Sequence, residues 1–252
     1  MIRMIMHGCN GSMGQVITQI AAEETNFSIV AGIDPYTKKE NSYPVFGTLA
    51  ECTVDADVIV DFASSKAVDA LLCYSVEKKI PVVVCTTGLS EEQNKQIEDA
   101  ASKVAILRSA NMSLGVNLLM KLVKEAAQVL SKAGFDIEIL EKHHNKKLDA
   151  PSGTALSLAD SINEAMDQEF HYVYDRSQVR KARDKKEIGI MAVRGGSIVG
   201  EHDVIFAGTD EVVTFQHTAY SKAIFAKGAV SAAKFLAGKK PGLYSMKDVI
   251  ES

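Results

Sequence analysis

The segment from residue 143 to residue 155 gathers the side chains best suited to chemistry on an anionic ligand. Two adjacent imidazoles and two adjacent ammonium groups precede a turn that runs into a predicted helix: His143, His144, Lys146, Lys147 and Pro151-Ser152-Gly153-Thr154. The first turn of a helix offers unpaired backbone N–H groups and the positive end of the helix dipole, which stabilise a carboxylate or phosphate. Lys147 adds a mobile positive charge and a proton that it can give up. These residues indicate an anion site with a proton donor beside it.

Other interpretations fit the same residues. Lysines in loops are usually solvated, and Ser-Gly-Thr before a helix is ordinary capping chemistry. A metal site is disfavoured, because neighbouring residues on a strand point to opposite faces and one ion cannot easily take both His143 and His144. Taken alone, the segment favours an anion site and leaves the ordinary loop open.

The composition sets limits on what the chain binds. It has 252 residues, of which 46% are hydrophobic and 24% charged, as in an ordinary soluble globular protein of one large domain or two modest ones. The formal net charge of -4 gives no general attraction to nucleic acid, so an anion must be held by a local cluster of positive groups. We therefore expect no nucleic-acid partner.

Cysteine usage and the N-terminus bear on location. The four cysteines are scattered, without a Cys-x-x-Cys motif, and reduced thiols are the simplest account. The apolar run at the N-terminus meets Gly8 too soon for a signal peptide, and no run approaches the length that spans a bilayer. We expect a cytoplasmic protein without a membrane partner.

The first half of the chain has the pattern of a nucleotide-binding unit. An apolar run over residues 2–7 leads into the turn Gly8 to Gly14, a helical pattern follows, and a second apolar run over residues 27–33 ends at Asp34. Such a unit holds a dinucleotide, with the pyrophosphate on the helix N-terminus and a ribose hydroxyl on the acid. The glycine pattern is G-x-x-G-x-x-G, with Asn10 at the usual middle glycine, so by itself it also fits a plain packing turn.

Strands and helices then alternate. We predict strands over residues 57–62, 81–85 and 104–107, and helices over residues 66–79 and 91–103. This order predicts a parallel doubly wound sheet, in which ligands bind at the carboxyl ends of the strands. Their position alone makes four residues candidates for contact with the cofactor: Phe62, Thr86, Thr87 and Asn111. The same position fits loop residues that contact no ligand equally well.

The pattern changes after Ser113. We predict helices over residues 114–130, 154–166 and 221–236, and strands over residues 135–141, 188–193, 198–206 and 212–217. The charged residues 176–186 fit a solvated loop or a short helix. For the C-terminal tail, residues 243–250, packing on the first domain is one of two open alternatives, and a tail that does not pack there is the other. We expect a dinucleotide-binding domain of residues 1–112 and 222–252 and a second α+β domain of residues 113–221 with an open mixed or antiparallel sheet.

Motifs along the whole chain resemble those of the dihydrodipicolinate reductase (4-hydroxy-tetrahydrodipicolinate reductase) family of the lysine and diaminopimelate pathway. They occur in the family's order: Gly8-Cys9-Asn10-Gly11-Ser12-Met13-Gly14, Cys85-Thr86-Thr87-Gly88, Asn111-Met112-Ser113-Leu114-Gly115, His143-His144 through Pro151-Ser152-Gly153-Thr154-Ala155, Val193-Arg194-Gly195-Gly196 and Val199-Gly200-Glu201-His202. The resemblance implies an N-terminal Rossmann-like domain, an NAD(P)H-dependent reduction of a cyclic imine dicarboxylate to tetrahydrodipicolinate and water, and a homotetramer built through the second domain's sheet.

The resemblance also implies roles for individual residues. His143 corresponds to a proton donor or acceptor and Lys147 to a proton donor, while His144, Gly153 and Thr154 correspond to groups that hold substrate carboxylates. The residues that match the cofactor side are Gly8, Cys9, Asn10, Gly11, Ser12, Met13, Asp34, Cys85, Thr86, Thr87, Ser109, Ala110, Asn111 and Met112.

Four residues depart from the family pattern, and two of them, Ser12 and Cys85, bear on the cofactor. Ser12 stands where an arginine is usual, which removes a contact to a phosphate or a 2′-phosphate, and a carboxylate at Asp34 repels a 2′-phosphate. Both favour NADH over NADPH, although Lys38 and Lys39 could soften the preference. Cys85 replaces a glycine of the Gly-Thr-Thr-Gly turn and needs room there. Met112 and Lys222 replace a common phenylalanine and arginine away from the proposed catalytic groups.

Two rival functions remain compatible with the motifs. A redox sensor would bind NAD(H) without substrate-dependent turnover, but it would have no need of a proton donor such as Lys147. Another two-domain dehydrogenase, acting on an amino acid or an aldehyde, would differ only in its substrate. For any such enzyme we expect hinges near residues 111–115 and near Tyr220 that allow domain closure.

Overall fold

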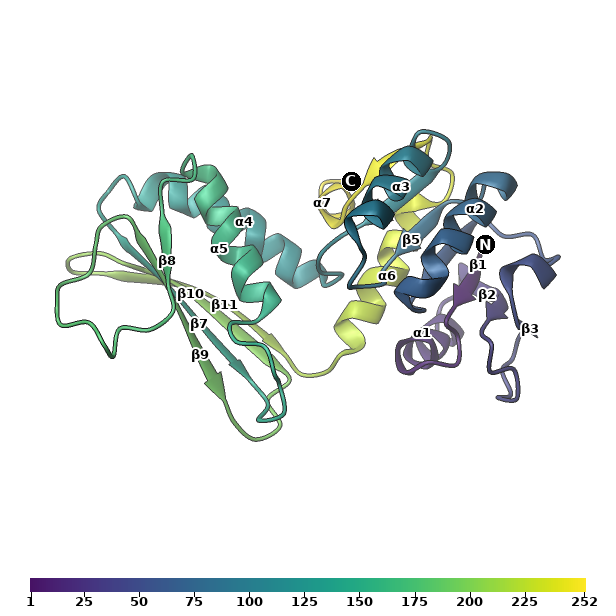
Figure 1. Ribbon diagram of the computed structural model, residues 1–252, viewed down its shortest axis with the longest axis horizontal. Helices are drawn as coiled ribbons and strands as arrows, with labels where there is room; N and C mark the ends of the chain where they lie inside the picture. The colour runs from purple at the N-terminus through teal and green to yellow at the C-terminus, as the bar shows by residue number, and fades with distance from the viewer. The chain divides into compact units, whose positions relative to one another are not determined.

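The structure is a computed structural model that describes residues 1–252 and divides into two compact units (Figure 1). Unit 1 comprises Met1–Leu114 and Ala223–Ser252, and unit 2 comprises Gly115–Lys222. The chain therefore leaves unit 1 once and returns to it once. None of the helices is long and apolar enough to cross a membrane.

Unit 1 is built on a seven-stranded parallel sheet, as the alternating pattern predicted. Its order is β12-β6-β5-β4-β1-β2-β3, and the strands are β1 (Ile2–His7), β2 (Phe27–Ile33), β3 (Val45–Phe46), β4 (Val58–Asp61), β5 (Val82–Val84), β6 (Ala105–Arg108) and β12 (Gly242–Tyr244). From β1 the chain first builds outward through β2 and β3, then returns to add β4 on the other side. Ligands of doubly wound sheets bind at this reversal, at the carboxyl ends of the strands.

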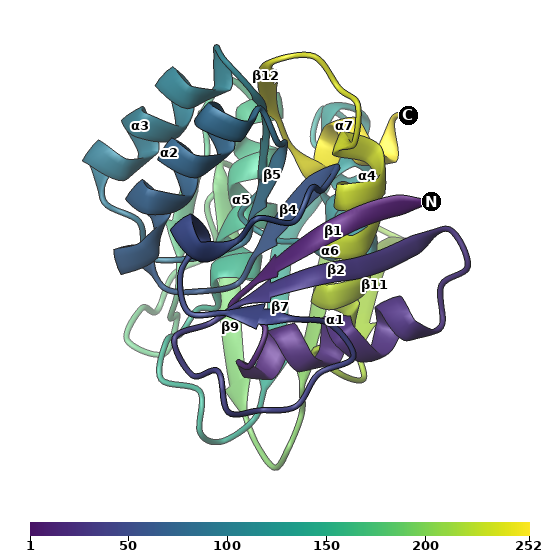
Figure 2. The same ribbon diagram turned by 90° about the vertical axis from the view of Figure 1, so that its right-hand side faces the viewer.

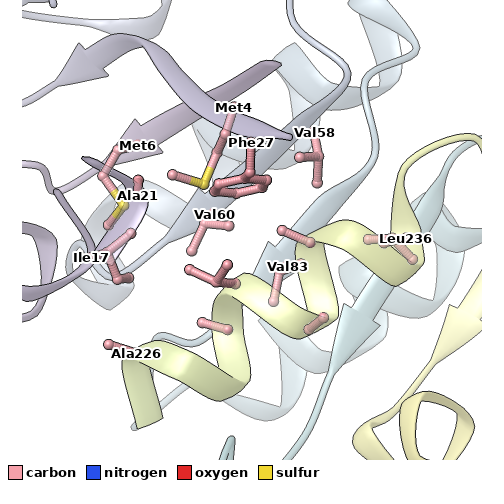
Figure 3. Packing of buried hydrophobic residues seen from close by; sticks show 14 of the residues in the cluster. Met4, Met6, Ile17, Ala21, Phe27, Val58, Val60, Val83, Ala226 and Leu236 are labelled. Atoms are coloured by element: carbon pink, nitrogen blue, oxygen red, sulfur yellow. The ribbon is translucent and has the colours of Figure 1, made fainter. Parts of the chain in front are cut away.

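Helices cover both faces of this sheet. Figure 2 shows α2 (Val68–Lys78) and α3 (Glu91–Ala101) on one side, and α1 (Ser12–Ala22) with α6 (Ala223–Leu236) on the other. Successive strand residues face opposite sides, so Met4 and Met6 pack against α1 and α6 while Ile5 packs toward α2 and α3. Figure 3 shows the first of these two cores. Burial on both faces explains why the strands read as continuous apolar runs.

The C-terminal tail belongs to unit 1. β12 extends the sheet beyond β6, and Met246 at the start of α7 (Met246–Ile250) is fully buried in the same core as α6. The sequence left this packing open. Three short strands, β3, β8 and β12, were not predicted, because two or three residues are too few to show a period. The short 3₁₀ helices η1 (Leu49–Glu51) and η2 (Ser65–Ala67) complete the unit.

Unit 2 is a five-stranded mixed sheet with helices on one face. Its order is β11-β10-β7-β9-β8, and its elements are α4 (Leu114–Leu130), β7 (Asp136–His143), α5 (Gly153–Ala165), β8 (His171–Val173), β9 (Glu187–Arg194), β10 (Gly200–Ala207) and β11 (Val212–Ala219). Strand β7 runs parallel to β9 and antiparallel to β10. α4 and α5 lie side by side over one face (Figure 1) and share its apolar core with β7, β9 and β10.

The charged residues 176–186 form a loop, and two of its arginines are not solvated as we had expected. Arg183 bonds Asp136 and Glu138 through 2.6 Å and 3.2 Å contacts and is only 18% exposed, and Arg176 also contacts Glu138. These carboxylates lie on the side of β7 opposite its buried residues Ile137 and Ile139. The loop is thus fixed to the sheet by ion pairs.

Candidate active site

The glycine turn after β1 is shaped by two close backbone contacts. Gly8 has φ +80°, and a Cβ there would lie 2.8 Å from the carbonyl oxygen of Phe62. A Cβ on Gly14 would lie 2.3 Å from the carbonyl oxygen of Gly8, so α1 can approach the turn this closely only with glycine. Gly11 precedes α1 and supplies no side-chain cap. The turn therefore presents backbone, with the positive end of α1, to a ligand.

Asp34 is joined directly to this turn. Its carboxylate accepts hydrogen bonds from the backbone N–H of Asn10 at 3.0 Å and of Tyr36 at 2.9 Å. The side chain of Asn10 in turn donates to the carbonyl of Tyr36 and accepts from Asn41 at 2.9 Å. Asn10, in the place of the middle glycine, thus ties the turn to the segment after β2, and the structure brings the predicted residues Gly8 to Met13 and Asp34 together.

A buried carboxylate links the ends of β1, β4 and β5. Asp61 is fully buried, accepts a 2.7 Å hydrogen bond from the Thr86 hydroxyl and lies 2.8 Å from His7 Nδ1, a contact without hydrogen-bond alignment. The hydroxyl of Thr86 is thereby used inside the fold, whereas Thr87 is exposed. Burial raises the pKa of the Cys85 thiol, with a further contribution from Asp61, so Cys85 stays a neutral thiol.

The remaining predicted cofactor residues follow β6. Ser109 and Asn111 are half-buried, Ala110 is exposed and Met112 is buried in the core shared with α6. The Asn111 side chain accepts a 2.8 Å hydrogen bond from the backbone N–H of Ser113, just before α4. These four residues share the carboxyl edge of the parallel sheet with the turn after β5, as their position in the sequence predicted.

In unit 2, strand β7 ends at His143, and His144 lies beyond it. The two imidazoles therefore do not occupy successive strand positions, which removes the geometric objection to both serving one ligand. His143 is buried and His144 is half-buried. Lys147 follows in a turn closed by a hydrogen bond from its backbone N–H to the carbonyl of His144 at 3.1 Å.

Glu141 is a site residue that the sequence patterns did not single out. It is fully buried and its oxygens accept hydrogen bonds from His143 Nδ1 at 2.6 Å, from Arg194 at 2.7 Å twice, and from the Ser152 N–H at 2.9 Å. Burial raises its pKa, but the hydrogen bonds from Arg194, His143 and Ser152 outweigh that effect and leave the pKa below its usual value. A signal was present, because regular alternation along β7 places Glu141 on the same face as Ile137 and Ile139.

Ser152 and His202 extend this network. Ser152 caps α5 by accepting the Ala155 N–H at 3.2 Å, and its hydroxyl lies 2.9 Å from His202 Nε2. Since the Ser152 oxygen accepts the hydrogen bond of the cap, the Ser152 hydroxyl is free to donate its proton to His202. His202 then accepts this hydrogen bond on an unprotonated Nε2. Burial first, and the neighbouring charge of His143 second, lower the pKa of His202 to about 4. The His202 ring stands edge-on to His143, with centroids 5.2 Å apart.

We expect His202 to make stability depend on pH. Its pKa falls from 6.5 in the unfolded chain to about 4, so between these values the unfolded state binds more protons and stability is lost as pH falls. Because His202 is only 4% exposed, we expect the free energy of unfolding to fall by about 3 kcal/mol across this pH range. Urea unfolding at several pH values should show this slope in the wild type and a much weaker one in His202→Gln. The exposed His171→Gln variant should keep it, and equal slopes in all three proteins would contradict the assignment.

Lys147, Gly153 and Thr154 surround the start of α5. Lys147 Nζ lies 2.9 Å from Asp149 Oδ1, and this hydrogen bond lowers the pKa of Asp149. Gly153 is exposed, and a Cβ there would meet nothing within 4 Å, so the first turn of α5 is open to a ligand. Ser152, the cap of this helix, is held by Glu141, so the structure connects His143 with the proposed carboxylate-binding turn. The arrangement can bind an anion and move a proton.

Comparisons with known proteins agree with these two units. Residues 2–112 match the family described as dihydrodipicolinate reductase, N-terminus, and residues 115–250 match dihydrodipicolinate reductase, C-terminus. The 4-hydroxy-tetrahydrodipicolinate reductase of Caldanaerobacter subterraneus is 54% identical and that of Clostridium novyi is 47% identical, and each alignment covers 100% of this chain and 99% of the relative.

A solved structure extends the agreement to the fold. The dipicolinate-bound dihydrodipicolinate reductase from Paenisporosarcina sp. TG-14 is 27% identical, with a TM-score of 0.83 over 98% of this chain and 99% of that one. Full-length relatives, both family models and a closely similar fold thus lead to one assignment, and the chain belongs to the dihydrodipicolinate reductase family.

Proposed function

We propose that this NAD(P)H-dependent 4-hydroxy-tetrahydrodipicolinate reductase of lysine and diaminopimelate biosynthesis carries out its proton chemistry at the end of β7. Bound NAD(P)H supplies the hydride. As the unsaturated ring is reduced, negative charge on it must be met by a proton, which a positioned ammonium or imidazolium can give. The observation that carries the proposal is the buried link from His143 through Glu141 to the N-terminus of α5.

The residues divide into proton donors and carboxylate-binding groups. Lys147 is the first choice as donor because its side chain is 21% exposed and its ammonium can leave Asp149 for a ligand, and His143 is the second. His144, Gly153 and Thr154 hold the substrate carboxylates, the last two through the positive end of α5. A cyclic dicarboxylate suits this combination of cationic and N–H donors. Unit 2 is then the substrate-binding domain.

Unit 1 is the proposed dinucleotide-binding domain. The glycine turn and the N-terminus of α1 would hold the pyrophosphate, and Asp34 would receive a ribose hydroxyl. The shape of the turn supports this proposal, since a Cβ at Gly8 would collide with the backbone of Phe62 and one at Gly14 with the carbonyl of Gly8, so only glycines allow this close packing. The turn from Cys85 to Thr87 and residues 109–112 lie at the same carboxyl edge of the sheet and complete the proposed cofactor side.

We further propose a preference for NADH. Asp34 is fixed beside the turn by two backbone N–H groups, and Ser12 offers no positive charge for a 2′-phosphate. The expected result is a higher kcat/KM for NADH than for NADPH, with Ser12→Arg shifting the ratio toward NADPH. A strong preference of the wild type for NADPH would show that Asp34 and Ser12 have been misread.

The reaction itself is tested by following NADH absorbance with the purified full-length chain. Its oxidation should require the cyclic substrate, generated in place by the preceding enzyme of the pathway. A redox sensor would bind NADH without this dependence, and a dehydrogenase for another substrate would respond to a different compound in a panel of amino acids and aldehydes. NADH oxidation that depends on the cyclic dicarboxylate alone distinguishes the reductase from the redox sensor and from the dehydrogenase for another substrate.

The second sheet is the proposed assembly surface of a cytoplasmic homotetramer. Its face away from α4 and α5 carries half-buried Leu140 and Ile205 beside the ion pairs of Lys142 with Glu201 and Asp203, at 3.0 Å and 3.2 Å. No helix of unit 2 covers this side (Figure 1). Sedimentation of the purified protein measures the number of subunits, and four free cysteines are consistent with a reducing compartment.

A further inference from the structure

Glu141 contacts groups on both sides of the proposed chemistry. One carboxylate oxygen, Oε2, lies 2.6 Å from His143 Nδ1, and the other, Oε1, accepts the Ser152 N–H at 2.9 Å. Arg194 spans both oxygens at 2.7 Å. An ionised carboxylate only accepts hydrogen bonds, so His143 Nδ1 must be the donor.

This hydrogen bond determines which nitrogen of His143 exchanges protons. A neutral imidazole with its proton on Nδ1 has its lone pair on Nε2. Gly200 on β10 lies beside that nitrogen, and a Cβ at this position would stand 3.1 Å from Nε2. Gly200 is not in the left-handed backbone region, so the effect of a side chain here is one of space: a Cβ would force the imidazole to shift by a few tenths of an ångström. The absence of a side chain leaves that edge of the ring clear.

The same carboxylate fixes the proposed substrate-binding turn. Ser152 is the residue before α5, and Gly153 and Thr154 begin the helix. By holding the Ser152 N–H, Glu141 sets where the first turn of α5 lies relative to the imidazole. One buried side chain therefore controls the position of a proton-transfer group and of an anion-binding helix end.

We propose that Glu141 is a positioning residue that holds His143 in the Nδ1–H tautomer and aligns it with the N-terminus of α5. The inference rests on the proposed function of His143. Arg194 keeps the carboxylate ionised, and Gly200 keeps Nε2 accessible. Because Glu141 is fully buried, it acts through His143 and Ser152 and is not itself a catalytic residue.

A purely structural role for Glu141, that of neutralising half-buried Arg194, gives a different expectation. Removing one partner of a buried ion pair is strongly destabilising, whereas removing both partners is much less so. The double variant Glu141→Gln with Arg194→Met should therefore fold in either case. In it, a glutamine whose oxygen accepts the Ser152 N–H must turn its NH₂ toward His143 Nδ1, which forces the proton onto Nε2.

The experiment compares kcat, KM and the ¹⁵N spectrum of the His143 ring in the full-length wild type and the double variant. We expect kcat to fall about 100-fold, at the low end of what a positioned acid or base contributes, with KM for NADH little changed. The ring nitrogens should change from the Nδ1–H to the Nε2–H pattern. The matched control is Glu138→Gln, on the opposite face of β7 and also bonded to two arginines, which should leave kcat and the spectrum unchanged.

Three outcomes separate the possibilities. A double variant that turns over at the wild-type rate, while His143→Gln is inactive, overturns the inference alone. Wild-type kcat in His143→Gln overturns the proposed function of His143 as well. If the double variant does not fold, the wild-type spectrum decides, since an Nε2–H tautomer there contradicts the proposal, and Gly200→Ala gives the kinetic test through a lowered kcat.

Discussion

Replacing Lys147 with alanine is expected to lower kcat by about 10²- to 10⁴-fold, the range that a positioned acid or base contributes. The KM for NADH should change little, because Lys147 belongs to unit 2 and the glycine turn belongs to unit 1. Steady-state kinetics with saturating cyclic substrate measure both constants. The loss arises because no other ammonium group of the segment is partly enclosed and paired as Lys147 is with Asp149.

Lys146 provides the matched control for this experiment. It is the adjacent residue with the same side chain, and it is exposed. Lys146→Ala removes the same positive charge from the same loop, so a change caused only by the net charge of the loop would appear in both variants. We expect near wild-type kcat for Lys146→Ala, and an unchanged kcat in Lys147→Ala would remove Lys147 from the mechanism.

Replacing Arg194 with methionine is expected to lower the free energy of unfolding by about 3 kcal/mol, the lower end for breaking a buried ion pair. Glu141 is fully buried and would lose two hydrogen bonds to its oxygens, while the 19% exposure of the Arg194 side chain moderates the cost. Urea unfolding at neutral pH measures this difference. Arg3→Met is the control, because the Arg3–Asp57 pair is exposed and should contribute far less.

The effect of Arg194→Met should shrink in acid. The pKa of Glu141 in the folded protein lies below its ordinary value of 4.5, so its ion pair stabilises the fold above that value. The contribution is lost as pH falls through the folded pKa, where the carboxyl group becomes neutral in both states. The unfolding free energies of the wild type and the variant should therefore converge in acid. A difference that stays constant with pH would mean that Arg194 acts through packing alone.

The sequence predicted the first unit well because its signals are local. Each long strand of the parallel sheet is an apolar run. Each helix between strands shows a helical spacing of apolar residues and has its own start and stop signals. The predicted helix over residues 114–130 has the same bounds as α4. The short strands β3, β8 and β12 were missed, since they exist only because a neighbouring strand pairs with them.

The candidate site was predicted in part. The segment from His143 to Thr154 stood out because its chemical groups are close in sequence, and its resemblance to a known family supplied their roles. Glu141 was overlooked among the acids of an alternating strand, and Arg194 and His202 were seen only as parts of motifs. Their relation depends on register, since Arg194 stands beside His143 on parallel β9 and His202 stands opposite Glu141 on antiparallel β10.

The sequence by itself determined the element types, the glycine turn with Asp34 and the presence of cationic groups before a helix, because these follow from the spacing of neighbouring residues. Only the tertiary structure decided that Glu141 joins His143, Ser152 and Arg194. Arg194 lies 53 residues from Glu141 in the chain, and their pairing requires a particular strand order and register. Those properties arise from burying the sheet against α4 and α5, which no local pattern specifies.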